Sequence, residues 1–548
     1  MEMSCLRRFA AIAWFLLAGL AGQLSVPVPT AVAQQAGDGV FSGGFEPWAP
    51  PAAVRTITLT GNATLAPVEL VSMGIPFPPG ALNDAGLVRI LDGNGAEVAA
   101  FVRPTLRWHW LDNSIRAVKV QFFADPAGQY RFDTGAPRSL HLAEQPYDAG
   151  TRPGKQNAPV PRLLATLDRS WLVDSLVAGP QRPWDGQHWY DRYVDRQWQW
   201  AQNTAYSGVH GFLFDRASVI GLQYVRNGRP DYFAEFYNSA TFYLSKIKTT
   251  GNGGGWPDCT GGWVFDGVNA CDPKYSYAMP HLLLIALAGD DTRISPATLA
   301  HMVHNQMQGG WAGVIGAYQG GSQAWTERKI GLALEHVVSA WEITGDPAWR
   351  QHIVNIVGWL HAHQQTPPGD PFTGAWTHSW QTHEGMTYNA ATDVRGGSPW
   401  MSANIVGGLW RAWRVTQDPR IPAMLRDFGR YMEQHGFAPD ALAGNWRSSC
   451  NSGGTIGWYF SSGIAPQSAV IAIQNSNGSG ADSHNPELLM VMAAARRFET
   501  DPGWRAQFDQ RIARLSMYLN LSCAAASHTA RAFNWQHRNP EAVWLLEQ

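Results

Sequence analysis

Groups able to move protons are concentrated in one stretch of the chain, residues 377–388. Two histidines, a glutamate and a tyrosine fall within these twelve residues: His378, His383, Glu384 and Tyr388. Helix packing gives little reason for such a set, whereas proton transfer in catalysis uses these side chains. The stretch is therefore predicted to belong to an active site. The alternative is a metal site formed by His378, His383 and Glu384, although their spacing is not the i,i+4 spacing of a helical zinc motif.

Further candidates stand where other long connections run into helices. Tyr206 and His210 are four residues apart and would share one face of a helix that began there. Arg328 lies just after another long connection. Packing of the Tyr206 ring and solvent exposure of the Arg328 charge are the plain alternatives. The predicted catalytic residues are Tyr206, His210, Arg328, His383, Glu384 and Tyr388.

Tryptophan is unusually frequent, with 26 residues in the chain. Tryptophan faces stack on the apolar faces of sugar rings, and they also fill helix-packing cores. About half of these residues are expected to serve the core, but those in glycine-rich loops fit that explanation less well. The predicted substrate-binding residues are Trp256, Trp263, Trp325, Trp376, Trp380, Trp458, Asn404 and His484.

A short chain reversal at 342–349 shows which elements must position these groups. The helical spacing of apolar residues before it predicts a helix, which Gly345 can end. Asp346 can cap the next helix, and Pro347 fits its first position. Similar reversals occur at 227–231, 288–291, 416–419 and 500–504, spaced roughly 55 to 85 residues apart. The pattern predicts an array of helical hairpins.

The connections at the other ends of the predicted hairpins are long and rich in Gly, Trp, His and Tyr. They span 251–277, 309–327, 369–400 and 444–484. Long loops of this composition are usually functional. If the hairpins close into a ring, the long loops surround one mouth and the short turns lie at the opposite end.

The N-terminal part of the chain has the period-two pattern of β-strands. Ile57 and Leu59 alternate with threonines, and Val118, Val120 and Phe122 alternate with more polar positions. The chain is also too long for one core. We therefore predict a β domain over 52–160 and a helical catalytic domain over 161–548.

The first 33 residues have the features of a secretory signal peptide. Arg7 and Arg8 precede an apolar run, and small residues at 31–33 provide a cleavage site. Residues 34–51 are expected to be flexible, and the mature protein is expected to be secreted or periplasmic. No later stretch approaches the roughly 20 apolar residues of a membrane span. With a net charge of −2, no nucleic-acid partner is expected either.

Four cysteines follow the predicted signal peptide: Cys259, Cys271, Cys450 and Cys523. An even number in an exported chain favours two disulfides, Cys259–Cys271 and Cys450–Cys523, over free buried thiols. No cofactor is expected. The acidic residues Asp258, Asp266 and Asp272 suggest Ca²⁺ only weakly, because their spacing matches no EF-hand loop.

The β domain also carries a recognisable combination of segments: 74–82 (GIPFPPGAL), 88–95 (VRILDGNG), 106–108 (LRW) and 115–120 (IRAVKV). It resembles the N-terminal RIFT-barrel-type domain of the exo-rhamnogalacturonan lyase-like proteins. The resemblance covers about 50 residues, and residues 108–114 replace a shorter turn. It implies an α+β multidomain fold, in which a β-barrel or sandwich-like domain of RIFT type precedes an (α/α) toroid of about five to six helical hairpins.

These observations together favour a polysaccharide lyase that cleaves a uronic-acid-containing glycan by β-elimination. Such a reaction needs a group that neutralises the uronate carboxylate, a base and an acid, for which Arg, His and Tyr are suited. One alternative is a glycoside hydrolase with two carboxyl groups roughly 5 to 10 Å apart. Its candidates are Glu327, Glu384, Asp393 and Glu487. The other alternative is a non-catalytic protein that binds a polysaccharide or oligosaccharide.

Overall fold

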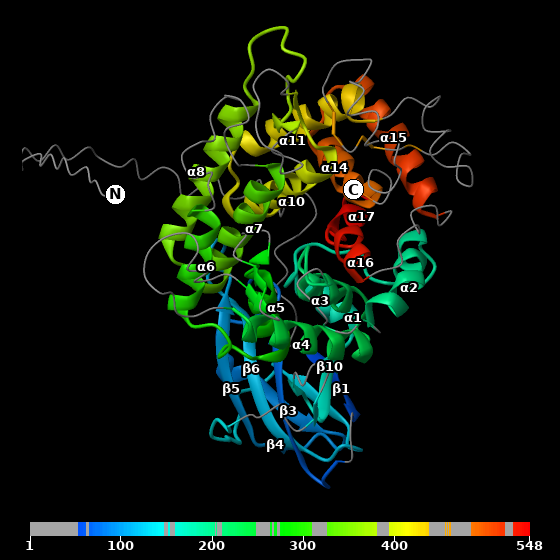
Figure 1. Ribbon diagram of the computed structural model, residues 1–548. Helices are drawn as coiled ribbons and strands as arrows, with labels where there is room; N and C mark the ends of the chain where they lie inside the picture. Colours follow the sequence, from blue (N-terminus) through cyan, green and yellow to red (C-terminus); the bar gives the residue numbers. More distant parts are fainter. Residues whose placement is uncertain are drawn as a thin grey trace, which may run out of the picture. The chain divides into compact units, whose positions relative to one another are not determined.

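The computed structural model describes 53–61, 65–146, 152–153, 159–202, 204, 206, 211–247, 263–265, 268–270, 275–308, 326–380, 394–437, 455, 457–458, 460–461, 484–520 and 530–548. All of these residues belong to one compact unit, Pro47–Gln548. The predicted signal peptide and the segment 34–51 lie outside them. A strand-rich N-terminal region is followed by a region of many helices (Figure 1).

Two antiparallel sheets form the strand-rich region. The larger has the order β10 (Leu163–Leu167), β1 (Val54–Gly61), β7 (Tyr130–Asp133), β3 (Arg89–Asp92) and β4 (Glu97–Val98). The smaller has the order β2 (Glu69–Pro76), β6 (Ile115–Ala124) and β5 (Ala100–Arg107), and a short ladder joins β8 (Arg152–Pro153) to β9 (Pro159–Val160). Ile57 pairs with Leu167, so strand pairing carries this region past residue 160.

The central strand β6 keeps the predicted alternation of residue types but not an alternation of exposure. Val118, Val120 and Phe122 are buried, as expected. Lys119 and Gln121 are buried as well, because helix α5 (Met279–Ala288) and the segment after β7 pack near this strand. The Lys119 ammonium donates to Glu144 at 2.8 Å. Both faces of β6 are therefore covered as far as Phe122, whereas Phe123 near the end of the strand is exposed.

The helical region contains pairs of helices joined by short turns. Its helices are α1 (Arg169–Asp174), α2 (Trp189–Gln202), α3 (Arg216–Asn227), α4 (Pro230–Ser245), α5, α6 (Pro296–Gln308), α7 (Glu327–Thr344), α8 (Pro347–Gln364), α10 (Pro399–Thr416), α11 (Arg420–Tyr431), α14 (Asn485–Phe498), α15 (Pro502–Asn520), α16 (Ala530–Gln536) and α17 (Glu541–Leu546). Small additions are the 3₁₀ turn η1 (Ala85–Leu87), the π turn η6 (Met432–Gly436) and two short ladders. These ladders are β11 (Trp263–Phe265) with β12 (Val268–Ala270), and β13 (His378–Ser379) with β14 (Arg395–Gly396). None of the helices described is both long and apolar enough to cross a membrane.

The turn between α7 and α8 has the predicted chemistry. Gly345 ends α7 with a positive φ of 67°, a conformation that costs glycine little. Asp346 caps α8 by accepting a hydrogen bond from the Ala348 amide at 2.9 Å, and Pro347 takes the first helical position. The predicted reversal is confirmed. After α10 the same left-handed position is taken by Gln417.

Six helices contact one another in sequence and close a circuit. Contacts run from α3 to α5, α7, α10, α14 and α16, and α16 returns to α3. We call these the circuit helices. The α7–α10 contact is especially close, since a Cβ on Gly331 would lie 2.4 Å from the Asn404 carbonyl carbon.

The strand-rich region packs against the C-terminal ends of two circuit helices (Figure 1). A Cβ on Gly74 would lie 2.3 Å from the Ala286 carbonyl oxygen in α5. At the end of α7, a Cβ on Gly345 would lie 2.6 Å from the His109 ring. These short turns therefore face the strands, and the opposite, N-terminal ends of α5 and α7 lie away from them.

Candidate functional site

Three polar or aromatic groups at the starts of circuit helices meet a fourth, Trp535, near the end of α16. Arg328 is the second residue of α7, Trp400 the second of α10, and His484 directly precedes α14. Trp535 lies in α16. Helix α10 contacts both α7 and α14, and α14 contacts α16, so the segments that carry these residues are neighbours in space.

The His484 imidazole contacts two indoles. It stacks on Trp400 with ring centroids 4.3 Å apart and an angle of 18° between the planes, and it lies 5.1 Å from Trp535. Its Nδ1 is hydrogen-bonded to Glu487 Oε2 at 2.5 Å. Burial raises the pKa of Glu487, while His484, Arg538 and Arg328 act in the opposite direction. When Glu487 is ionised it accepts a hydrogen bond from Nδ1–H, and Nε2 is then the basic nitrogen of the neutral imidazole.

Arg328 supplies a positive charge beside this pair. Its guanidinium carbon lies 5.5 Å from the centre of the Trp400 ring, and the side chain is partly buried. Toward the other described residues it forms no ion pair, and its buried Nε has no hydrogen-bond partner. Other arginines of the helical region differ, because Arg411 and Arg414 each contact a glutamate. We call Arg328, Trp400, His484, Glu487 and Trp535 the His484 cluster.

A second carboxylate–imidazole contact lies next to Arg328 in the chain. Glu327 is fully buried, and its Oε2 lies 2.6 Å from Nδ1 of the buried His378. Its Oε1 accepts a hydrogen bond from the Ser398 amide at 3.0 Å. The His378 ring also makes an edge contact with Phe460, at 5.2 Å between centroids. His378, from the stretch that the sequence singles out, thus lies in the interior beside Glu327.

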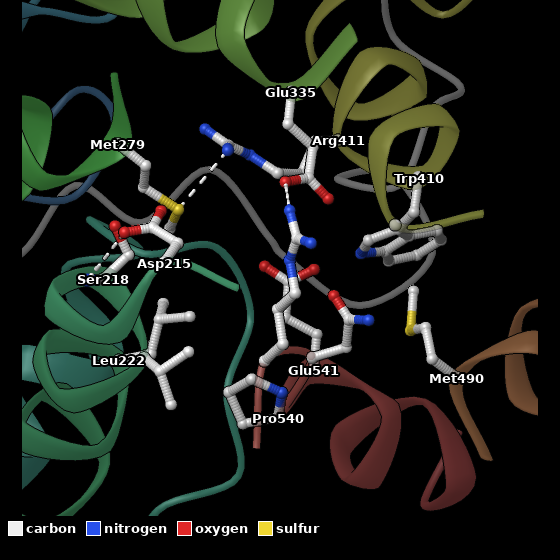
Figure 2. A pocket seen from close by; sticks show the side chains of 14 residues that line it. Asp215, Ser218, Leu222, Met279, Glu335, Trp410, Arg411, Met490, Pro540 and Glu541 are labelled. Atoms are coloured by element: carbon white, nitrogen blue, oxygen red, sulfur yellow. Dashed lines mark hydrogen bonds and ion pairs between the residues drawn. The ribbon is translucent and has the colours of Figure 1, made fainter. Parts of the chain in front are cut away.

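A small polar cavity lies among the circuit helices (Figure 2). Its volume is about 30 Å³, which suits water and is far too small for a sugar ring. Asp215, Glu335 and Glu541 line it together with Arg411 and Arg538. Burial raises the pKa of Asp215 to about 6. The cavity gathers ionisable groups but offers no room for a glycan.

Tyr206 belongs to a buried network with residues of α3 and α4. Its hydroxyl contacts Glu235 Oε1 at 3.0 Å and Ser239 Oγ at 2.9 Å. Arg216 donates to the same Glu235 oxygen at 2.6 Å. Burial and the Glu235 charge raise the Tyr206 pKa. These contacts give the hydroxyl a structural role, and Tyr206 makes no described contact with the His484 cluster.

Four of the predicted substrate-binding residues are buried among other protein groups. Trp376 donates to the Leu360 carbonyl at 3.1 Å and packs on Phe428. Trp380 packs on Phe460, and Trp458 is 6% exposed. Asn404 accepts a hydrogen bond from Arg538. Of the described residues predicted to bind substrate, His484 is the one that joins the cluster.

Several predictions concern residues outside the described part of the chain. These are His210, Trp256, Trp325, His383, Glu384, Tyr388 and Asp393, the four cysteines, and the acidic residues Asp258, Asp266 and Asp272. Trp263 lies in β11, and its side chain is likewise outside the description. Within the described ranges, no three His, Cys, Asp or Glu side chains are placed to hold a metal ion.

The sequence reasoning missed Trp400 and Trp535 as members of a site. Trp400 follows Ser398 and Pro399, which are a helix-start signal directly after a long connection. That signal could have identified Trp400 as a candidate site residue. Trp535 lies in a short helix near the C-terminus and carries no comparable signal. The sequence pointed to Glu487 only as a candidate carboxylate of a glycoside hydrolase.

Comparison with known proteins returns no match: no family model, curated protein or solved structure is significantly similar to this chain.

Proposed function

We propose that the chain is a secreted carbohydrate-active enzyme, a polysaccharide lyase that cleaves a uronic-acid-containing glycan by β-elimination at the His484 cluster. In this proposal the strand-rich region is a RIFT-type domain and the helical region an (α/α) toroid. The closed contacts of the six circuit helices support the toroid. The short turns against the strands and the cluster at helix starts support a site at the end away from the strands.

The observation that carries the proposal is the partly buried Arg328 guanidinium without a described carboxylate partner. A guanidinium in protein surroundings usually has an anionic partner, and its planar fork matches a carboxylate. Here it lies over the Trp400 indole, which also stacks on an imidazole that a buried glutamate orients. A uronate carboxylate would complete the charge of Arg328 and bring the sugar ring to the aromatic groups.

The elimination then proceeds with the following roles. Arg328 binds the uronate carboxylate and stabilises the negative charge that develops on it when C5 loses its proton. His484 Nε2 takes that proton, and Glu487 stabilises the resulting imidazolium through Nδ1. The C5 electron pair forms the C4=C5 double bond as the C4–O bond breaks. The leaving oxygen takes a proton from Tyr388 or His383, the sequence candidates for the acid.

The direct test is to incubate the purified protein with a panel of uronic-acid polysaccharides and follow the ultraviolet absorbance of unsaturated products. We expect Arg328→Met to reduce kcat/KM at least a hundredfold, since a charge-assisted contact in the transition state is removed. Arg426→Met is the matched control. Arg426 is also partly buried but already pairs with Asp427 on α11, so its loss should leave turnover unchanged.

Other results would overturn the proposal in different ways. New reducing ends without unsaturated products would indicate a glycoside hydrolase. Glycan binding without turnover by the wild-type protein would indicate a non-catalytic binding protein. Equal activity in Arg328→Met and Arg426→Met would remove Arg328 from the mechanism.

A further inference from the structure

We infer that Glu327 is a positioning residue that fixes Trp400 and Arg328 in the His484 cluster by joining the first turns of α7 and α10. The inference rests on the proposed function for its consequence in turnover. Its structural content can be tested without any glycan. It assigns to Glu327 a role other than that of a hydrolase carboxylate.

The first step is the contact between the two helix starts. Glu327 opens α7, and its Oε1 accepts from the amide of Ser398, the residue that precedes α10. Trp400 is two residues further along. Arg328 is the residue after Glu327. One carboxylate oxygen therefore links the backbone that carries Trp400 to the backbone that carries Arg328.

The other oxygen of the Glu327 carboxylate, Oε2, lies against His378. Oε2 lies 2.6 Å from His378 Nδ1 in β13, a close contact that lacks hydrogen-bond geometry, so the His378 ring limits the space open to the Glu327 side chain. Both residues are almost fully buried. The carboxylate also lies at a helix N-terminus, where the helix dipole stabilises negative charge. A buried side chain with one oxygen hydrogen-bonded to the Ser398 amide and the other packed against the His378 ring has little freedom to move.

The role proposed for Glu327 differs from that of the packing between α7 and α10. Farther along, α7 and α10 already touch closely through Gly331 and Gly408. Gly331 lies about one turn from the start of α7 and Gly408 about two and a half turns from the start of α10, so their contact sets the helix axes away from the first turn of α10. The rotation and tilt of the Trp400 indole depend on the backbone of the first turn of α10, at the start of the helix. If packing alone fixed the indole, removal of the Glu327 side chain would leave it in place.

The consequence falls on geometry in the cluster. The Trp400 indole stacks on His484 and lies beneath Arg328. A shift of the indole would change the position of the proposed base and of the carboxylate-binding arginine together. A displacement of about 1 Å in such groups costs on the order of a hundredfold in rate.

The test uses the full-length protein labelled with 5-fluorotryptophan, with the Trp400 fluorine signal assigned through Trp400→Phe. Glu327→Ala should shift or broaden that signal. Glu327→Gln keeps the reach and an acceptor oxygen, so the signal should remain near its wild-type position. Glu327→Asp keeps the charge but withdraws the carboxylate by one methylene, so the signal should move as in Glu327→Ala.

The matched control for Glu327→Ala is Glu499→Ala. Glu499 also has a fully buried side chain and pairs with Arg430, but it lies at the far end of α14. Its loss should leave the Trp400 signal unchanged. If Glu327→Ala does not fold, the comparison of the Asp and Gln variants decides. An unmoved signal in Glu327→Asp, or a shift in Glu499→Ala equal to that in Glu327→Ala, would overturn the inference.

Activity provides the second readout on any uronic-acid glycan that the wild-type protein cleaves. We expect kcat/KM to fall at least tenfold in Glu327→Asp and less than threefold in Glu327→Gln. A wild-type protein without turnover would refute the proposed function and leave the fluorine test standing. If kcat/KM depended instead on the negative charge, so that Glu327→Gln was less active than Glu327→Asp, the positioning role would be overturned.

Discussion

Replacing Asp215 by Asn should make the protein more stable at neutral pH, although Asp215 is almost fully buried. Its carboxylate accepts a hydrogen bond from the Ser218 amide, which an Asn side-chain oxygen can also accept. Its backbone has a positive φ of 61°, a conformation that Asn tolerates. The substitution therefore removes the charge while it keeps the local geometry.

The magnitude follows from the raised pKa. Burial holds the pKa of Asp215 at about 6 in the folded protein, against an ordinary value of 3.8. At 1.36 kcal/mol per pKa unit, ionised Asp215 costs the folded state roughly 2 to 3 kcal/mol above pH 6. Its contribution to stability is greatest below pH 3.8 and falls as the pH rises to about 6. The stability gained by Asp215→Asn should therefore grow over the same pH range, from 3.8 to about 6.

The assay is urea unfolding of both proteins between pH 4 and 8, with free energies of unfolding from linear extrapolation. The variant should be more stable by roughly 2 to 3 kcal/mol at pH 7.5, with the difference shrinking toward pH 4. Glu335→Gln is the matched control, because Glu335 lines the same cavity but pairs with Arg538. That variant should be destabilised at pH 7.5. A loss of stability in Asp215→Asn at pH 7.5 would show that the Asp215 charge is favourably paired and would refute the reasoning.

Two further predictions concern the contact between the strands and the helices. Gly74→Ala should lower the free energy of unfolding by about 2 kcal/mol or more, because its Cβ would lie 2.3 Å from the Ala286 carbonyl oxygen; stability equal to wild type in urea unfolding would contradict this. Glu342→Gln should cost about 3 kcal/mol or more at pH 7, since Glu342 contacts both Arg116 and Arg411 in the interior. Although burial acts to raise the Glu342 pKa, Arg411 and Arg116 hold it below its usual range, so this loss should shrink as the pH falls below 4.5; a pH-independent difference would contradict that assignment.

The sequence predicted the helix boundaries best where one residue had a single physical role. Gly345, Asp346 and Pro347 mark an end, a cap and a start, and the structure has each in that role. Strand β6 was predicted from its alternation, but its burial on both faces could not be, because α5 comes from more than 150 residues later in the chain. Contacts over such distances leave no local pattern.

The site was less predictable for the same reason. His484 and Arg328 could be singled out because they follow long connections. The indoles of Trp400 and Trp535 acquire a role only when α10, α14 and α16 come together. Conversely, Tyr206 and Trp376 have side chains suited to catalysis and sugar binding, yet their partners Glu235 and Leu360 place them in the interior.

The most direct test of the lyase proposal is digestion of a uronic-acid glycan in water enriched in the heavy oxygen isotope ¹⁸O, with the products analysed by mass spectrometry. Elimination breaks the C4–O bond without adding water, so the account predicts unsaturated products that contain no heavy oxygen, formed by the wild-type protein and lost in His484→Ala. Products that carry one heavy oxygen at the new end, or unsaturated products formed equally well by His484→Ala, would contradict it.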